Sequence, residues 1–200
     1  MHSSGTVRAE HEALPCTTIE RRSLLAAVSL LGAGLAFPAC AAQAFAEARR
    51  LPEFTHRDAQ DWINHQPLRV SDLAGSIVLL DVWTFGCWNC YRSFPWLRGV
   101  ESRFSARGLR VVGVHAPELE HERSSQRVRA KVKEFRLTHP IMIDGDHSYW
   151  RALQNRYWPT FYLVDRDGRI RSSFAGETHA GDAQAERIEQ NIEALLRERT

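Results

Sequence analysis

Two cysteines three residues apart, Cys87 and Cys90, lie between a buried-strand pattern and a helical pattern. The preceding segment, 77–83, is a short apolar run rich in β-formers, which is typical of a strand covered on both faces. The residues that follow predict a helix. Cysteines at i and i+3 share one helical face and lie close enough for a disulfide. This order of strand, cysteine pair and helix favours an α/β domain that carries thiol chemistry.

The rest of the chain continues the alternation of strands and helices. Further strands are expected at 110–115, 160–165 and 170–174, the last two joined by the turn Asp165-Arg-Asp-Gly168. Apolar residues recur at i, i+4 and i+7 from Val128 and again from Ile188, which predicts two helices. Strands that alternate with helices imply a sheet covered by helices. The 200 residues suffice for one such domain and a targeting segment.

The position of the cysteine pair predicts redox chemistry. At a helix N-terminus, Cys87 is exposed to unpaired backbone N–H groups and to the positive end of the helix dipole, and both favour the thiolate. Cys90, one turn inward, is expected to be the resolving thiol. A zinc site would need about four ligands, and His115, His139 and His147 do not form a closely spaced ligand pair. A purely structural disulfide is disfavoured because so small a loop constrains the unfolded chain little.

The stretch 77–95, with Trp-Thr-Phe-Gly-Cys-Trp-Asn-Cys at its centre, resembles the active site of thioredoxin-fold proteins. Three further segments, 112–118, 155–160 and 165–168, make the chain similar to exported TlpA/ResA-type thiol–disulfide oxidoreductases. The thioredoxin-like domain of DipZ-type cytochrome c biogenesis proteins is the most similar pattern. The resemblance covers roughly Trp62 to Leu196, and it implies a thioredoxin-like fold with a central mixed β-sheet flanked by helices.

The resemblance assigns proton transfer to two acidic residues. Asp81 stands six residues before Cys87, where thioredoxins carry the acid that accepts the proton of the resolving thiol. Because Asp81 is the one charged residue in an apolar strand, burial should raise its pKa. Glu118 stands where many TlpA/ResA-type proteins carry a Glu after the next strand, although a solvated loop residue is an equally simple interpretation.

The resemblance also implies a substrate-binding surface. Pro159 matches the cis-proline that faces the cysteines in the thioredoxin fold, and it leaves the backbone of Trp158 free to pair with an extended substrate segment. Trp88, between the cysteines, is expected to be exposed and to form part of an apolar docking surface.

The first part of the chain has the layout of an export signal. Arg21 and Arg22 precede a run without charged residues, and Ala44-Phe45-Ala46 fits a cleavage site. We therefore expect a cleaved, twin-arginine-like signal over 1–46, an irregular lead-in over 47–66 and the thioredoxin-like domain over 67–200. An uncleaved anchor and lipidation at Cys40 are alternatives. All three place the domain outside the cytoplasm, in the periplasm or an equivalent compartment.

These features predict a protein disulfide oxidoreductase, with reduction the expected direction and cytochrome c maturation a candidate process. The 26 basic and 24 acidic residues give a net charge of +2, which argues against nucleic acid as a partner. The expected partners are protein thiols and disulfides and a membrane protein that supplies electrons; no cofactor and no metal are expected. Two alternatives are a thiol peroxidase, in which Thr84 would precede the reactive Cys87, and a copper chaperone using the cysteines with His115 or His179.

Overall fold

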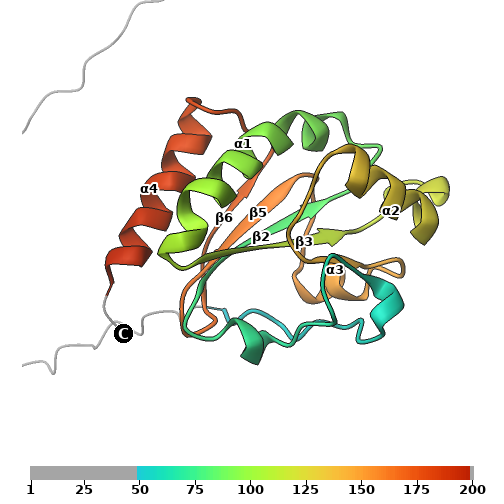
Figure 1. Ribbon diagram of the computed structural model, residues 1–200, viewed down its shortest axis with the longest axis horizontal. Helices are drawn as coiled ribbons and strands as arrows, with labels where there is room; N and C mark the ends of the chain where they lie inside the picture. Colours follow the sequence, from blue (N-terminus) through green and yellow to red (C-terminus); the bar gives the residue numbers. More distant parts are fainter. Residues whose placement is uncertain (1–48, 199–200) are drawn as a thin grey trace, which may run out of the picture. The chain divides into compact units, whose positions relative to one another are not determined.

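The computed structural model describes residues 49–198, which form a six-stranded mixed sheet in the order β1-β4-β3-β2-β5-β6 (Figure 1). Strand β2 (Ile77–Trp83) pairs in parallel with β3 (Leu109–His115), and β3 pairs in parallel with β4 (Ile141–Ile143). The antiparallel partners are β5 (Thr160–Val164) beside β2, β6 (Ile170–Ala175) beside β5 and β1 (Trp62–Ile63) beside β4. The thioredoxin-like α/β fold predicted from the sequence is confirmed.

Helices cover both faces of this sheet. In Figure 1, α1 (Trp88–Phe104) and α4 (Ala183–Arg197) lie side by side on one face, to which α2 (Ser125–Glu134) also contributes apolar side chains. The short α3 (Ser148–Ala152) packs on the opposite face. Four 3-10 turns connect the elements, at Ala59–Asp61, Val70–Leu73, Ser105–Arg107 and Glu120–Arg123. Within the described residues, no helix is both long and apolar enough to cross a membrane.

Strand β2 is buried along its whole length, because its alternate side chains enter two separate halves of the core. Ile77, Leu79 and Trp83 pack under α1, α2 and α4, whereas the side chains between them pack toward α3. Asp81 belongs to the first set by this alternation. One acidic side chain is therefore placed inside the apolar layer beneath α1.

Residues 49–66, which belong to the predicted irregular lead-in, pack against the rest of the domain. Leu51, Phe54 and Trp62 are buried in the core on the α3 side of the sheet, and β1 adds an antiparallel edge strand next to β4. The physical reason is that α3, five residues long, leaves much of this face to be covered by other apolar groups. The predicted signal segment, 1–46, lies outside the described residues.

Candidate redox site

Cys87 and Cys90 form a disulfide at the start of α1, with their Cα atoms 5.3 Å apart. Cys87 is the N-cap residue of the helix, and its Sγ accepts a hydrogen bond from the backbone N–H of Cys90 at 3.1 Å. Cys87 is partly exposed, whereas Cys90 is fully buried. Because only the first sulfur can be reached by a large substrate, this geometry suits Cys87 as the attacking group and Cys90 as the resolving group.

Asp81 lies buried in β2, as the sequence predicts, and the whole residue is only 1% exposed. Neither carboxylate oxygen has a hydrogen-bond partner among residues 49–198. Burial raises the pKa of the Asp81 carboxyl to about 8, because the charged form loses its hydration without gaining a compensating contact. An acid with such a pKa can take up and release a proton near neutral pH.

Glu122 is the buried acid of the loop after β3, and sequence reasoning missed it. One carboxylate oxygen accepts the backbone N–H of Gly86 at 2.6 Å, and the other accepts those of Glu118 and Leu119, both at 2.7 Å. Burial opposes ionisation of Glu122, but hydrogen bonds from these backbone groups and from Thr84 outweigh it and hold the pKa below its usual value. Glu118 itself is exposed, so its predicted part in proton transfer stays a prediction.

His115 closes the site from the end of β3. Its Nε2 lies 3.3 Å from the Thr84 hydroxyl, and its ring packs against Trp83 and Phe85. Desolvation by burial lowers the pKa of His115 to about 4, despite the opposing charge of Glu122. The imidazole is therefore neutral at physiological pH and acts as an uncharged wall of the site.

The peptide bond between Trp158 and Pro159 is cis, as the resemblance implies. The Trp158 indole is fixed from two sides, by a hydrogen bond from Nε1 to the carbonyl of Ala116 at 3.0 Å and by packing against the tilted ring of Trp150. Within residues 49–198, the backbone of Trp158 makes no hydrogen bond outside the regular elements. It is therefore free to pair with an extended peptide.

Exposed aromatic side chains adjoin the disulfide. Trp88 is 65% exposed and stacks on Tyr91, which is also exposed. Both line a shallow groove that also includes Phe85, Cys87 and Phe135, together with the charged Lys131 and Glu134. Exposed aromatic rings beside a reactive sulfur suit a docking surface for apolar segments of a partner protein.

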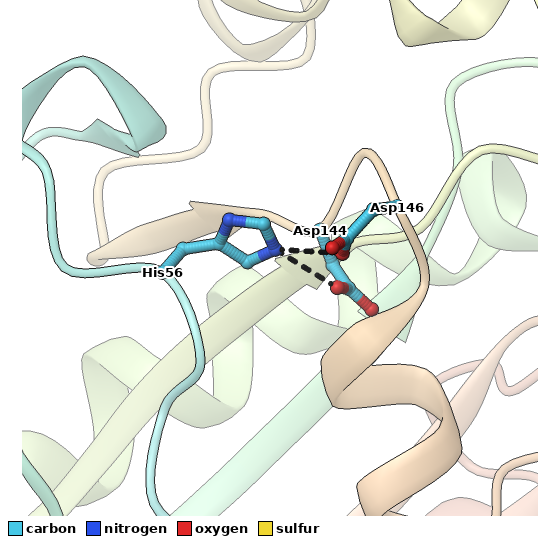
Figure 2. A group of neighbouring side chains, drawn as sticks. All are labelled: His56, Asp144 and Asp146. Carbon is cyan, nitrogen blue, oxygen red and sulfur yellow. Dashed lines mark hydrogen bonds and ion pairs between the residues drawn. The ribbon is translucent and has the colours of Figure 1, made fainter.

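A separate cluster joins the N-terminal segment to α3. Figure 2 shows the His56 ring facing Asp144 and Asp146, and Nε2 lies 3.1 Å from an oxygen of each. Among the described residues, these three form the one group of His, Cys, Asp or Glu side chains that lie closely enough together to hold a metal ion. Their contacts already have a structural role, because Asp144 also accepts the backbone N–H groups of Tyr149 and Trp150 at the start of α3. Neither cysteine belongs to the cluster.

The sheet order, the disulfide at the start of α1 and the cis bond before Pro159 define a thioredoxin-fold protein with a dithiol–disulfide site. Residues 39–173 match the AhpC/TSA family. The chain belongs to the AhpC/TSA family.

Several curated proteins are similar to this chain. SUPPRESSOR OF QUENCHING 1 of Arabidopsis thaliana is 37% identical over 136 residues, which are 68% of this chain and 13% of that protein. DipZ of Mycobacterium tuberculosis is 34% identical over 119 residues, 58% of this chain and 17% of that protein. The chain thus spans less than a fifth of these longer relatives. The thiol-disulfide oxidoreductase YkuV of Bacillus subtilis matches at 26% identity over 74% of this chain and 95% of its own length.

Among solved structures, a thiol:disulfide interchange protein DsbE from Chlorobium tepidum, described as putative, superposes with a TM-score of 0.64. It is 25% identical and covers 74% of this chain and 96% of its own. These comparisons confirm the thioredoxin-like fold and the similarity to DipZ-type and ResA-type proteins. They also agree with the predicted thiol–disulfide oxidoreductase.

Proposed function

We propose that this chain is a protein thiol–disulfide oxidoreductase whose reaction centre is the Cys87–Cys90 pair. The observation that carries the proposal is the arrangement of the two sulfurs: Cys87 is accessible at the helix N-terminus, and Cys90 is buried directly behind it. Relatives named as thiol-disulfide oxidoreductases, YkuV and ResA of Bacillus subtilis, support the same chemistry.

Two exchange steps follow from this arrangement. The Cys87 thiolate attacks one sulfur of a substrate disulfide, forms a mixed disulfide and releases the other substrate sulfur as a thiolate. Cys90 then loses its proton and attacks Cys87 Sγ, which closes the Cys87–Cys90 disulfide and releases the second substrate sulfur. Two electrons pass from the cysteine pair to the substrate. In the opposite direction, the same groups oxidise a substrate dithiol.

Asp81 is the proposed acceptor of the Cys90 proton. Its pKa of about 8 is close to that of a free thiol, so proton transfer between the two groups costs little free energy. The absence of any hydrogen-bond partner for Asp81 within residues 49–198 leaves the carboxylate available for this exchange.

Trp88, Trp158 and Pro159 are the proposed substrate contacts. The exposed ring of Trp88 offers an apolar surface, and the unpaired backbone of Trp158 offers hydrogen bonds to an extended segment. Main-chain pairing is indifferent to side-chain identity, so this mode suits an enzyme that accepts disulfides in several sequence contexts.

We place the reaction outside the cytoplasm, with reduction as its direction and cytochrome c maturation as a candidate process. The layout of 1–46 supports export, and the similarity to DipZ supports the reductive direction. A membrane protein would then supply electrons to Cys87 and Cys90. In this proposal, the redox domain comprises residues 67–200, and the buried residues of 49–66 form part of its core.

The experiment that tests the direction is the reduction potential of the Cys87–Cys90 couple, measured by equilibration with glutathione or dithiothreitol. A potential near about −270 mV supports a reductase. A potential near about −120 mV makes the pair an oxidant and overturns the proposed direction.

A further inference from the structure

Three buried polar side chains without partners meet at Gly113 in β3. Trp83 Nε1, His139 Nε2 and both Asp81 oxygens have no hydrogen-bond partner among the described residues. A Cβ placed on Gly113 would lie 3.2 Å from Trp83 Nε1 and 3.2 Å from His139 Nε2. The nearest atom to that Cβ would be Cγ1 of Ile141, at 2.9 Å, so the two nitrogens and the Ile141 side chain together surround the Cα of Gly113.

Asp81 borders the same glycine from the neighbouring strand. It is the register partner of Gly113 in the parallel pairing of β2 with β3. Paired residues of adjacent strands direct their side chains to the same face of a sheet. The Asp81 carboxyl and the missing side chain of Gly113 consequently lie next to each other beneath α1.

His139 links this region to the surface. The imidazole is 2% exposed, and its Nδ1 lies 3.4 Å from an oxygen of Glu101 on α1. The Glu101 side chain is 24% exposed and reaches solvent. A carboxylate at Nδ1 fixes the tautomer with the hydrogen on Nδ1, so Nε2 presents a lone pair to the space beside Gly113.

We propose that His139 and Glu101 carry protons between Asp81 and solvent, through a water molecule held beside Gly113. This inference rests on the proposed thiol–disulfide exchange. A water there can accept from Trp83 Nε1, donate to His139 Nε2 and contact Asp81, which gives it the three partners typical of a buried water. Position 113 needs glycine, because a Cβ there would crowd both nitrogens and the Ile141 side chain.

The proton balance follows the two exchange steps. When Cys90 attacks, its proton passes to Asp81; Asp81 passes a proton to the water, and the water passes one to His139 Nε2. His139 then gives its Nδ1 proton to Glu101, which releases it to solvent. When the cysteine pair is reduced again, a proton moves inward along the same path and restores the starting tautomer of His139.

Other titratable groups around Asp81 do not offer an equivalent path in the described part of the chain. His115 on β3 bonds to Thr84 and has a pKa lowered to about 4 by burial, so it is a poor proton carrier at neutral pH. Glu189 on α4 is bound to Trp96 and Arg103. Among residues 49–198, no group forms a hydrogen bond to either Asp81 oxygen, and desolvation is the cause of its raised pKa.

The test separates attack by Cys87 from resolution by Cys90. The reduced chain is mixed with 5,5′-dithiobis(2-nitrobenzoic acid) in a stopped-flow instrument between about pH 6 and pH 9, a range that spans the pKa values of thiols and of Asp81. The first thionitrobenzoate released reports attack by Cys87, and the second reports resolution. Variants H139F, E101Q and the double variant are compared with H65Q, an exposed histidine that serves as control.

The expected result is that each single variant slows resolution by about tenfold or more and shifts its pH profile, while attack is unchanged. The double variant should be no slower than the single ones, because both residues serve one path. Resolution rates and pH profiles equal to wild type in E101Q and H139F overturn the path. If H139F fails to fold, E101Q alone tests the path, because Glu101 is partly exposed and its replacement should be tolerated. Absence of both phases in wild type would instead refute the proposed function.

Discussion

The carboxylate of Glu122 accepts a hydrogen bond from the backbone N–H of Gly86, the residue directly before Cys87, at 2.6 Å. The loop after β3 is thereby tied to the loop that presents the reactive cysteine. A Cβ on residue 86 would clash with the same carboxylate oxygen, so this close approach requires glycine. Glu122 thus serves as an internal brace between two loops of the redox site.

Replacing Glu122 with Gln should lower the free energy of unfolding by about 1–3 kcal/mol, because the amide group turns a donor toward backbone N–H groups that need an acceptor. Chemical denaturation of the oxidised protein measures the change. Glu118→Gln is the matched control, since that side chain is exposed in the same loop. Equal losses in the two variants would show that Glu122 is not the brace.

Asp81→Asn should raise stability in neutral and alkaline solution. The folded-state pKa of Asp81, about 8, exceeds its model value of 3.8, so the unfolded chain ionises first as the pH rises. Below about pH 4, Asp81 does not lower the free energy of unfolding. Between about pH 4 and pH 8, its ionisation in the unfolded chain lowers that free energy by roughly 1 kcal/mol per pH unit. Denaturation curves across this range should show the fall in wild type and not in the variant. If the free energy of unfolding depends on pH in the same way in both proteins, Asp81 is not a buried acid without a partner.

Trp88→Ala should reduce the rate with a protein disulfide such as insulin by about five- to tenfold, because an exposed apolar contact to the substrate is lost. The ring touches Tyr91 but lies outside the core, so folding should be unaffected. A small disulfide reagent, which needs no docking surface, should react at the wild-type rate. A similar loss with both substrates would place the effect on Cys87 itself.

Hydrogen peroxide should be a poor substrate. The Thr84 hydroxyl, which a peroxidase would direct at Cys87, lies 3.3 Å from His115 Nε2. Peroxide consumption in the presence of dithiothreitol should therefore remain near the rate of the free thiol reagent. Rapid consumption that depends on Cys87 but not on Cys90 would favour the peroxidase alternative.

The parts of the fold that sequence predicts well are those with a strong local pattern. The apolar run of β2 and the spacing of Cys87 and Cys90 define a buried strand and a helix N-cap, and both are confirmed. Asp81 is predictable as a buried acid because it interrupts an otherwise apolar strand. The cis bond at Pro159 is predictable through resemblance alone, since nothing in the local sequence requires it.

Other parts depend on tertiary contacts that leave little local trace. Strand β4 has three residues and β1 has two, too few to show a period. Glu122 sits in the charged run 118–123, where every acid looks solvated until the backbone groups that surround it are known. Likewise, His139 acquires significance only through Gly113 and Glu101, which are distant in sequence.

Exchange of electrons between the Cys87–Cys90 pair and protein disulfides is measured by insulin reduction with dithiothreitol as electron source. Wild type should accelerate insulin precipitation, and Cys87→Ser should abolish the acceleration, because the accessible sulfur is the attacking group. Cys90→Ser should instead accumulate a mixed disulfide on Cys87 that mass spectrometry detects. Full activity in Cys87→Ser would show that Cys87 is not the attacking group.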